Sequence, residues 1–501
     1  MPAKPIRVKI RTEQGQTKSL ASGTGAFTTP TGAGPDLFLG LGPDPAAAAL
    51  LTGPGPVRFV ECPEFESQMD PKWRHMVPGD WKRIDPEDLD ANLVGTSTVR
   101  IFRQNASLFP SFWGPILART TLWAAGIGPR QGGAKRVLFA HGPGALMVLE
   151  ISRAFSRAGF EVRSLAENVG PEDLVLALRD GCPDLFFSLN FQGLDRFGLN
   201  LHLLREAGVV PVTWCVDNPF HLLSGLETAF WRDMIVLTTD AWAVDLLRNL
   251  GTRAHFLPLA ADSDVFVCQD LDRPPVWDSV FVGRSAFPNR DRFFSGLDVP
   301  KALLPEAKAL MASGGRPDFS WWLERLGPQS LWPGREVRRA GLGAEICSLG
   351  WRSAVLEAVA GAVGLKVVGD EGWKELLGSE VTILPPVDYY HGLRDIYRLS
   401  AVTLTTTSLL LPGALTQRHF DVWVAGGCLL TDRIPGLDLF PRHLTDPVSF
   451  STPDEAASLA RKLVRDPRRR GEITAAWRET ILYGHTYDHR VATILELASE
   501  I

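Results

Sequence analysis

Residues 416–432 decide the fold of this chain, and they read Thr416-Gln-Arg-His-Phe-Asp-Val-Trp-Val-Ala-Gly-Gly-Cys-Leu-Leu-Thr-Asp432. The first half predicts a short helix, on which Arg418 and Asp421, three residues apart, would share a face. Gly426-Gly427 predicts the end of that helix, because glycine adopts the backbone conformations that a tight turn requires. The apolar run that follows predicts a buried strand ending at Asp432.

The chain from residue 136 onward repeats this combination of helix and strand. Short apolar runs that read as strands alternate with helical patterns, and a linker containing Pro274-Pro275 divides the series in two. Such alternation predicts parallel sheets covered by helices. The expected strands are 137–140, 184–189, 209–216, 234–237 and 255–257 before the linker, and 279–283, 365–369, 381–384, 402–405 and 428–431 after it.

The first 130 residues follow a different pattern. A strand and a glycine turn, Asp36-Leu-Phe-Leu-Gly-Leu-Gly42, precede an Ala-rich helix and a second strand, Val57-Arg-Phe-Val-Glu61. Glycines after a strand, followed about 20 residues later by an acid, outline a nucleotide-binding unit. The third glycine of that motif is missing, and Pro43 and Pro45 crowd the turn. We therefore favour a structural accessory domain over a working cofactor site.

Composition narrows the classes of function. The 501 residues carry 52 Lys and Arg against 57 Asp and Glu, whereas a nucleic-acid partner requires a strongly basic surface. The six cysteines form no Cys-x-x-Cys pair, and no Asp-x-Asp segment stands directly after an expected strand, so we expect neither disulfides nor a metal site. The chain has neither an apolar run of about 18 residues nor a signal peptide at its start, which predicts a cytoplasmic protein without a transmembrane segment.

The 416–432 stretch resembles the donor-nucleotide corner of GT-B glycosyltransferases, in particular those of the CgeB-like, spore-maturation type. These proteins carry an R-x-F-[DE] helix, a Gly-Gly-type turn and a leucine-rich strand ending in Thr-Asp. Further similar segments are Ser188-Leu-Asn190, Trp214-Cys-Val-Asp-Asn-Pro219 and His485-Thr-Tyr-Asp-His-Arg490. The resemblance covers about residues 136–495 and implies an α/β fold with two facing Rossmann-like domains built on parallel sheets.

This resemblance, with the linker, predicts the division of the chain. We expect an N-terminal α/β accessory domain, a GT-B N-terminal domain that binds the acceptor, a GT-B C-terminal domain that binds the donor, and a last helix that packs back on the GT-B N-terminal domain. Their expected bounds are 1–130, 131–270, 275–475 and 476–501.

The resemblance also implies a nucleotide-sugar site in the C-terminal domain. An acid at the position of Asp421 would bind the ribose hydroxyls, and the alternative is an exposed ion pair with Arg418. Phe281-Val-Gly-Arg284 resembles the opening of a donor domain, where Arg284 either binds the diphosphate through its guanidinium fork or is a surface arginine. The expected donor-binding residues are Asp421, Arg418, His419, Gly426, Gly427, Gly283, Arg284 and Gly369.

Polar residues also follow the strands of the middle domain, at the sheet edge where open parallel sheets bind ligands. His141-Gly-Pro-Gly144 offers either a general base near neutral pH or a turn with a surface histidine. Asp217 follows a buried strand, as a site carboxylate or as a helix cap. We take Asp217 and His141 as catalytic candidates, and the expected cleft or acceptor residues are Gly142, Gly144, Asn190 and Asn218.

The resemblance, together with these patterns, implies a metal-independent GT-B hexosyltransferase. It would move a sugar from a nucleotide-sugar, its co-substrate, to a glycan, polymer or protein acceptor of the surface-polysaccharide, spore-coat or flagellar type, with no separate cofactor. Many retaining enzymes carry a second acid about eight residues before the ribose-binding one, but Gly413 stands there, so the stereochemical outcome stays open. The alternatives are a nucleotide-sugar epimerase or hydrolase of the same plan, and a non-catalytic glycan-binding scaffold.

A basic cluster near the end of the chain leaves peripheral membrane contact open. It comprises Arg461, Lys462, Arg465, Arg468, Arg469 and Arg470. Such a cluster either binds anionic lipid or a sugar phosphate, or is a solvated helix end.

Overall fold

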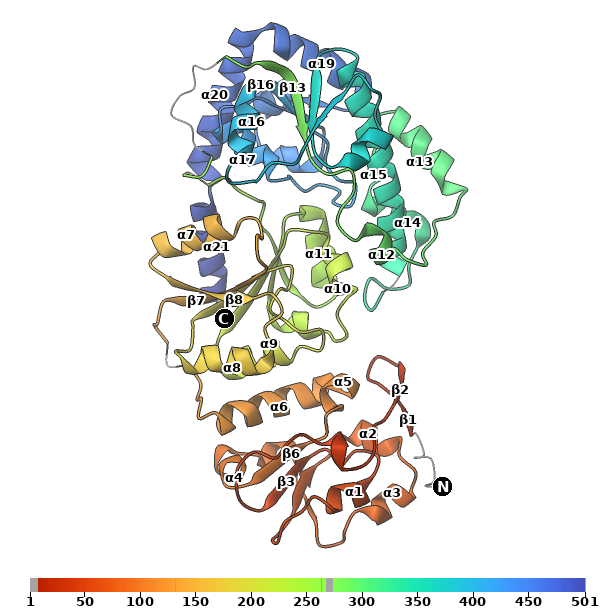
Figure 1. Ribbon diagram of the computed structural model, residues 1–501, viewed down its shortest axis with the longest axis vertical. Coiled ribbons are helices and arrows are strands. Elements are labelled where there is room, and N and C mark those ends of the chain that lie inside the picture. The colour runs from red at the N-terminus through yellow and green to blue at the C-terminus, as the bar shows by residue number, and fades with distance from the viewer. Residues whose placement is uncertain (1–7, 131, 263, 267–273, 335, 501) are drawn as a thin grey trace. The chain divides into compact units, whose positions relative to one another are not determined.

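The computed structural model describes residues 8–130, 132–262, 264–266, 274–334 and 336–500 (Figure 1). Cys268, one of the six cysteines, lies outside the described residues. The chain forms two compact units. The first comprises residues 1–143, 160–213 and 226–234, and the second comprises residues 144–159, 214–225 and 235–501.

The second unit contains a six-stranded parallel sheet, here called the C-terminal sheet, with the strand order β15-β14-β13-β16-β17-β18. If these strands are numbered in chain order, with β13 as strand 1, their order across the sheet is 3-2-1-4-5-6. This is the order of doubly wound nucleotide-binding folds. The chain reverses direction across the sheet between β13 and β16, and ligands of such folds bind there. The strands are β13 Trp277–Val282, β14 Leu365–Val368, β15 Thr382–Leu384, β16 Ser400–Thr405, β17 Leu429–Asp432 and β18 Ser449–Phe450.

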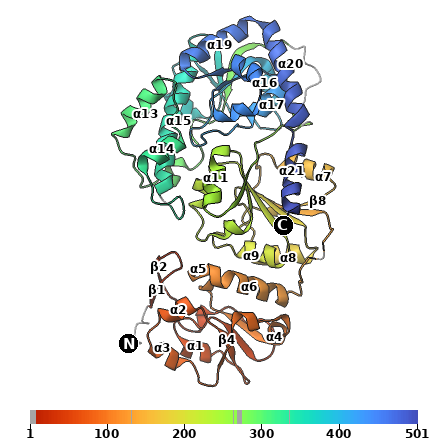
Figure 2. The same ribbon diagram turned by 180° about the vertical axis from the view of Figure 1, so that it is seen from behind.

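Helices cover both faces of the C-terminal sheet. Helix α15 (Glu336–Ala360) lies on one side and packs against α19 (Pro453–Arg465), whereas α16 (Leu393–Leu399), α17 (Arg418–Val424) and α20 (Pro467–Gly484) lie on the other (Figure 2). The remaining helices after β13 are α12 Arg290–Phe293, α13 Leu303–Ala312, α14 Phe319–Leu326, α18 Arg442–Thr445 and α21 Tyr487–Ser499.

The expected helix, turn and strand at 416–432 are confirmed. Gly426 follows α17 with a left-handed backbone angle φ of 84°, which a residue with a Cβ atom rarely adopts. Strand β17 begins two residues after Gly427. All of α17 after Arg418 is buried, and Trp423 stacks on Trp477 of α20 with ring centroids 4.9 Å apart. This stack attaches α20 to the sheet-covering helix.

A second six-stranded sheet, here called the middle sheet, has the order β12-β11-β10-β9-β7-β8. If these strands are numbered in chain order, with β7 as strand 1, their order across the sheet is 2-1-3-4-5-6. The direction in which the chain crosses the sheet reverses between β7 and β9. The strands are β7 Arg136–His141, β8 Glu161–Ala166, β9 Leu185–Leu189, β10 Val210–Cys215, β11 Ile235–Thr238 and β12 Arg253–Phe256. The associated helices are α7 Val148–Arg157, α8 Pro171–Arg179, α9 Leu199–Glu206, α10 Pro219–Leu223 and α11 Ala241–Asn249.

The accessory region carries a third parallel sheet, of order β5-β4-β3-β6. Its strands are β3 Asp36–Leu39, β4 Arg58–Val60, β5 Lys82–Arg83 and β6 Thr98–Ile101, beside a hairpin of β1 Lys9–Arg11 and β2 Thr17–Ser19. Its helices are α1 Pro45–Ala49, α2 Pro63–Ser67, α3 Lys72–Met76, α4 Ala91–Gly95, α5 Asn105–Leu108 and α6 Pro110–Ala124. Helix α6 packs against both α4 and α9 (Figure 1).

Side chains of the accessory region itself occupy the space beside the glycine turn that follows β3. A Cβ atom at Gly40 would lie 2.6 Å from Nδ2 of Asn105, and one at Gly42 would lie 2.8 Å from the ring of Phe102. The Glu61 carboxylate accepts hydrogen bonds from the amides of Leu41 (2.8 Å) and Cys62 (2.9 Å). The acid therefore closes the turn onto the neighbouring strand, in agreement with a structural role for this domain.

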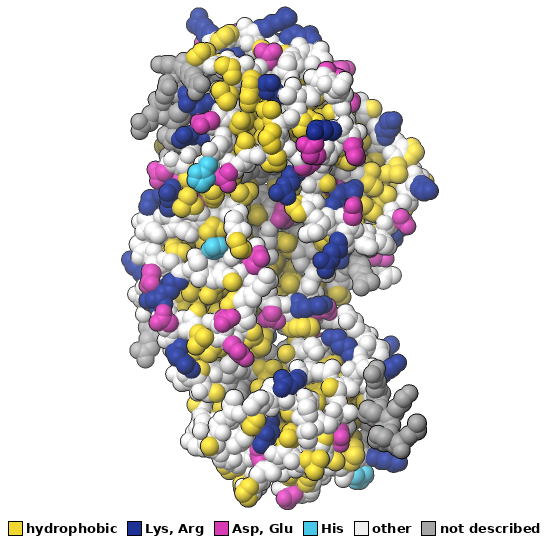
Figure 3. Space-filling model, viewed as in Figure 1, with side chains coloured by type: hydrophobic (Ala, Val, Ile, Leu, Met, Phe, Trp, Pro, Cys, Tyr) yellow, Lys and Arg dark blue, Asp and Glu magenta, His cyan; other side chains and the backbone are white. Residues whose placement is uncertain are grey.

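The predicted fold class, two Rossmann-like parallel sheets of the GT-B plan with an N-terminal α/β region, is confirmed by these strand orders. In the part of the chain that the structure describes, no helix combines the length and apolarity needed to cross a bilayer. Basic and acidic side chains are interspersed over the face drawn in Figure 3.

Candidate functional site

A cavity of about 610 Å³ lies in the second unit, beside the strand reversal of the C-terminal sheet. We call it the switch-point cavity. It receives residues from the ends of β13 and β16, from helices α15 and α17, and from the segment that follows β10. The polar residues among its lining are Asp217, Asn218, His221, Gly283, Arg284, Glu345, Arg352, Thr406, Ser408, Thr416 and Arg418.

Arg418 and Gly283 form one wall of this cavity. The Nε atom of Arg418 donates to the Val282 carbonyl over 2.8 Å, and a Cβ atom on Gly283 would lie 3.1 Å from the terminal nitrogen of the same guanidinium. Trp373 donates from Nε1 to the Gly283 carbonyl over 2.9 Å. The alternative considered for Asp421, an ion pair with Arg418, is not formed, because the Arg418 side chain turns to the end of β13.

A second guanidinium, that of Arg352 on α15, lines the same cavity. Its Nη1 atom donates to the Arg284 carbonyl over 2.9 Å, and its Nε atom is buried without a hydrogen-bond partner among the described residues. Burial lowers the pKa of Arg352, and Arg418 nearby adds to that lowering. Two neighbouring cations, one of them with a buried N–H unsatisfied, favour an anionic ligand.

Glu345, about two turns before Arg352 on α15, brings a carboxylate to the lining. It is 5% exposed, and its Oε1 atom lies 3.5 Å from Nε of Arg290. Burial raises the pKa of Glu345. The cavity thus carries a carboxylate that reduces, without cancelling, the positive charge of the three arginines that line it.

Aromatic rings form the remaining wall. Phe281, Phe287 and Phe293 line the cavity, and the His221 ring lies 5.1 Å from that of Phe293. Burial lowers the pKa of His221 to about 3, so this imidazole is neutral at physiological pH. A planar base or a sugar ring could pack on such a surface.

Asp217 and Asn218 close the cavity from the segment after β10. Asp217 is exposed and lines the cavity, as expected for a site carboxylate. Asn218 caps α10, accepting from the amides of Phe220 (3.0 Å) and His221 (3.1 Å), and its Nδ2 atom donates to the Leu410 carbonyl over 2.7 Å. The helix-cap function considered for Asp217 therefore belongs to Asn218.

Asp432 fixes the loop that follows β16. Its two carboxylate oxygens accept from the amide and the hydroxyl of Thr407, each over 2.8 Å, and Arg316 forms an ion pair with it. Asp432 is 1% exposed and is not part of the cavity lining. It acts on the site by holding the loop that contains Thr406 and Ser408.

Asp421 is buried behind the cavity. The residue is 1% exposed, its Oδ2 atom accepts from the Tyr389 hydroxyl over 2.6 Å, and its Oδ1 atom accepts from Nε2 of Gln417 over 2.9 Å. Burial raises the pKa of Asp421 well above its usual range. The structure therefore does not bring this carboxylate to the cavity wall, although Arg418, one turn earlier, lies there.

The other expected donor residues lie around α17 and β14. His419 is buried, its Nε2 atom lies 2.9 Å from the Thr431 hydroxyl, and burial lowers its pKa to about 4. Gly369 follows β14, where a Cβ atom would lie 2.3 Å from the Gly283 carbonyl oxygen. Gly427 lies behind the sheet, and Gly426 lines a different cavity. Of the expected donor set, the switch-point cavity brings together Gly283, Arg284 and Arg418.

His141, Gly142 and Asn190 belong to the first unit. His141 ends β7 and Asn190 follows β9, and because these strands are neighbours the two residues stand at the reversal of the middle sheet. Nε2 of His141 is buried without a partner among the described residues, and a Cβ atom at Gly142 would lie 2.5 Å from the Glu167 carboxylate. Gly144, with φ of 68°, opens a segment of the second unit.

Sequence reasoning missed Glu345, Arg352, Phe287 and Phe293. The first two lie inside a helix of 25 residues whose charged positions carry no local motif. The two phenylalanines follow Arg284 in a segment that reads as an ordinary loop and a short helix. A signal that could have been used is the pairing of two arginines, Arg284 and Arg290, with aromatic residues directly after β13.

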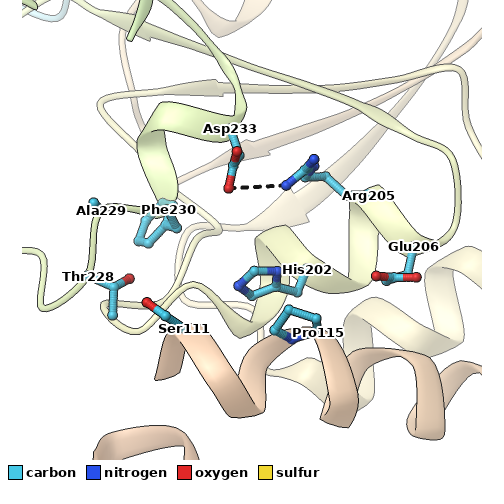
Figure 4. A pocket seen from close by; sticks show the side chains of 9 residues that line it. All are labelled: Ser111, Pro115, His202, Arg205, Glu206, Thr228, Ala229, Phe230 and Asp233. Carbon is cyan, nitrogen blue, oxygen red and sulfur yellow. Dashed lines mark ion pairs between the residues drawn. The ribbon is translucent and has the colours of Figure 1, made fainter. Parts of the chain in front are cut away.

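A further cavity of about 430 Å³ lies in the first unit, between α6 and α9 (Figure 4). Two of its polar side chains form an ion pair, since Arg205 and Asp233 face each other over 3.1 Å, and Thr228 donates to the Phe197 carbonyl. The described residues include no group of three or more His, Cys, Asp or Glu side chains that could hold a metal ion.

Comparison with protein families gives one match, over the C-terminal part of the chain. A family model described as glycosyl transferase-like matches residues 352–496, from Arg352 of the switch-point cavity to within α21. A comparison with curated proteins gives no match.

A comparison with solved structures gives matches of low sequence identity, and three of them follow. T4 phage BGT in complex with its UDP-glucose substrate is 8% identical over 73% of this chain and 99% of its own, with a TM-score of 0.44. An alpha-glucosyltransferase in complex with UDP and a 13-mer DNA is 10% identical over 70% and 95%, with a TM-score of 0.41. The N-terminal domain of Candida albicans trehalose-6-phosphate phosphatase is 11% identical over 74% and 98%, with a TM-score of 0.39.

Two findings describe the C-terminal part of the second unit. Its sheet order is that of a nucleotide-binding domain, and most of its sequence after residue 352 matches a family model. From residue 352 to residue 496 the chain is similar to glycosyl transferase-like proteins, and its two six-stranded sheets follow the GT-B plan.

Proposed function

We propose that this protein is a glycosyltransferase that binds a nucleotide-sugar donor in the switch-point cavity. The observation that carries the proposal is that Arg352, Arg418 and Gly283, which directly follows β13, line one cavity at the strand reversal of the C-terminal sheet. Guanidinium groups beside a glycine turn suit a diphosphate, because they bind two oxygens at once and the glycine permits close approach.

The shape of the cavity supports a donor larger than a diphosphate. At about 610 Å³ it falls within the range of small-molecule sites, roughly 300–1,000 Å³, and one wall is aromatic. We propose that the ring wall of Phe281, Phe287 and Phe293 receives the base or the sugar. The arginines would neutralise the charge that develops on the leaving diphosphate.

Asp217 is the proposed general base. It is exposed to the cavity, so its carboxylate could accept the proton of an acceptor hydroxyl while that oxygen attacks the anomeric carbon. Exclusion of water from the cavity would limit hydrolysis of the donor. The acceptor is proposed to be a glycan, polymer or protein, and the motif at 418–432 favours the CgeB-like type.

The donor proposal is tested by thermal denaturation in the presence of UDP, GDP, CDP, TDP and their sugars. A ligand at 100 times its dissociation constant adds about 2.7 kcal/mol to the free energy of unfolding. We expect one nucleotide to raise the Tm of the wild type, and Arg418→Gln to lose most of that rise, since a charge-assisted hydrogen bond contributes about 1.5–3 kcal/mol. Arg461→Gln, an exposed arginine of α19, is the matched control.

The proposal is wrong if no nucleotide or nucleotide-sugar shifts the Tm of the wild type. A shift that survives in Arg418→Gln but not in Arg461→Gln would place the nucleotide elsewhere. A shift without turnover of any donor would favour the binding or scaffold alternative. Hydrolysis or epimerisation of the sugar without an acceptor would favour the other enzymatic alternative.

The base is tested separately from binding. Asp217→Asn should keep the nucleotide-induced Tm shift and lower kcat about 10²–10⁴-fold, the usual contribution of a general base. His141→Gln is the matched comparison, because His141 is the second candidate in the sequence. Full turnover in Asp217→Asn together with loss of turnover in His141→Gln would transfer the role to the histidine.

A further inference from the structure

A second cavity of about 570 Å³ opens at the opposite edge of the C-terminal sheet. It is lined by Ser400 and Ala401, which begin β16, and by Cys428, which directly precedes β17. The switch-point cavity lies at the other end of β16, where Thr406 follows the strand. The two cavities therefore lie at opposite ends of one strand and are separate sites.

Three arginines line this second cavity, which we call the three-arginine cavity: Arg398 at the end of α16, and Arg470 and Arg478 on α20. Of the described residues in its lining, Glu479 carries the one carboxylate, and that residue is exposed. Burial lowers the pKa of Arg470, and Asp466, which caps α20, opposes part of that lowering. The lining thus has an excess of positive charge.

Backbone carbonyls hold two of these arginines in place. Nη1 of Arg470 donates to the carbonyls of Leu463 (2.7 Å) and Val464 (3.3 Å), and Nε of Arg478 donates to that of Val424 over 3.4 Å. The carbonyl partners of Arg470 are neutral, so they position its guanidinium without neutralising its charge.

Arg398 supplies the strongest indication of a ligand. Its Nη2 atom is buried and has no hydrogen-bond partner within the described part of the chain. A buried N–H donor without a partner costs about 1–3 kcal/mol, more when charged, and a bound anion is one arrangement that would satisfy it. In the basic cluster of the sequence, Arg468 is 91% exposed, whereas Arg470 turns inward to the cavity.

We propose that the three-arginine cavity binds the phosphate or diphosphate group of a small phosphorylated molecule, as a site distinct from the donor site. Phosphate oxygens accept several charge-assisted hydrogen bonds at once, which three convergent guanidiniums can supply. The Thr474 hydroxyl in the lining can form a hydrogen bond with an ester or a sugar hydroxyl. The inference does not rest on the glycosyltransferase proposal.

Isothermal titration calorimetry of the whole chain with inorganic phosphate and with pyrophosphate tests this site. We expect Arg398→Gln and Arg478→Gln each to weaken binding at least tenfold. Arg468→Gln, an exposed arginine of the same helix α20 that pairs with Glu472, should bind as the wild type does. Circular dichroism and Tm confirm that each variant is folded, and two independent variants keep the test valid if one of them is not.

Pyrophosphate could also occupy the switch-point cavity, and Arg418→Gln separates the two sites. If both sites bind, the wild type shows two sites and each class of variant loses a different one. The inference is overturned if Arg398→Gln and Arg478→Gln bind phosphate and pyrophosphate as the wild type does, or if Arg468→Gln weakens binding equally. Loss of nucleotide binding alone in Arg418→Gln would bear on the donor site and leave this one standing.

A phosphate on a lipid headgroup offers the same chemistry as a free one. Sedimentation with vesicles of phosphatidylcholine containing phosphatidic acid distinguishes the sources. Binding to vesicles that Arg398→Gln weakens would place the phosphate on a lipid. Binding of soluble phosphate without sedimentation would identify a free phosphorylated molecule.

Discussion

Glu61 is a buried carboxylate held by backbone amides, and it makes stability depend on pH. Burial is the main cause that raises its pKa from 4.5 to about 7. The folded state then binds more protons than the unfolded state between these two values. The free energy of unfolding contributed by this group is therefore largest below pH 4.5 and falls as pH rises toward 7.

We expect Glu61→Gln to remove this part of the pH dependence. A shift of this size corresponds to about 3 kcal/mol across the window, at 1.36 kcal/mol per pKa unit. Urea denaturation at several pH values between 4.5 and 7 measures it. Glu87→Gln, an exposed glutamate of the same domain, should retain the wild-type slope. An unchanged slope in Glu61→Gln would mean that this carboxyl group is not the one that titrates.

Asp421 either positions α17 or binds the ribose of the donor, and the variants Asp421→Ala and Tyr389→Phe distinguish these two roles. Its carboxylate does not line the switch-point cavity, so we expect Asp421→Ala to lower the free energy of unfolding by about 1–3 kcal/mol, because it leaves the Tyr389 hydroxyl and Gln417 amide unpaired. Some nucleotide-induced Tm shift should remain, unlike in Arg418→Gln.

Tyr389→Phe completes this test. It removes the hydroxyl that donates to Oδ2 of Asp421 over 2.6 Å and leaves the carboxylate in place. Direct ribose binding by Asp421 would appear as an intact or stronger nucleotide shift in Tyr389→Phe and a complete loss in Asp421→Ala. Parallel, partial losses in both variants would support positioning of α17 through the Tyr389–Asp421–Gln417 hydrogen bonds.

At the scale of elements, the contact between α17 and α20 depends on two stacked indoles. Trp423 and Trp477 lie with their rings 1° from parallel, and Nε1 of Trp477 donates to the Leu444 carbonyl over 3.0 Å. Trp477 is 2% exposed. Because α17 carries Arg418, and α20 carries Arg470 and Arg478 of the three-arginine cavity, their packing supports both sites.

We expect Trp477→Ala to lower the free energy of unfolding by about 3–5 kcal/mol, the usual cost of truncating a buried aromatic residue. Chemical denaturation measures the change. Tyr483→Ala is the matched control, since Tyr483 lies on the same helix and is 87% exposed, and it should change stability by less than about 0.5 kcal/mol. Equal effects of the two substitutions would show that α20 is not held by the stack.

Across the whole molecule, positive side chains or a metal ion must neutralise the negative charge of the donor's diphosphate during sugar transfer. Arg284, Arg352 and Arg418 all line the switch-point cavity. Under the proposed function these cations, rather than a divalent metal, neutralise the leaving group. We therefore expect EDTA to leave the rate of sugar transfer unchanged, measured as release of the nucleoside diphosphate. A loss of rate that Mg²⁺ or Mn²⁺ restores would contradict this mechanism.

The second unit gives the clearest comparison of sequence with structure. Helix α17, the Gly426 turn and strand β17 follow the pattern of residues 416–432 closely, because helix spacing, a glycine and an apolar run are local properties. The parallel sheets follow from alternation, since a strand that must cross to its parallel neighbour requires a connecting helix. These features could be predicted without knowledge of any distant contact.

The partners of individual side chains could not be predicted in this way. Asp421 was expected beside a ribose, yet its oxygens accept from Tyr389, 32 residues earlier, and from Gln417. Asp217 was weighed as a cap, but the neighbouring Asn218 fills that role and also reaches the Leu410 carbonyl, 192 residues away. Such hydrogen bonds depend on which loops lie side by side in the folded chain, and a local sequence pattern does not predict this.

The sequence by itself therefore determined the α/β class, the helix-turn-strand unit at 416–432 and the position of Gly283 and Arg284 after a buried strand. The tertiary structure decided that Arg352 and Glu345, from the middle of α15, share a cavity with Arg418, and that Asp421 stays behind it. The reason is physical: hydrophobic periodicity fixes each element from neighbouring residues, whereas burial and charge pairing are set by residues that only packing brings together.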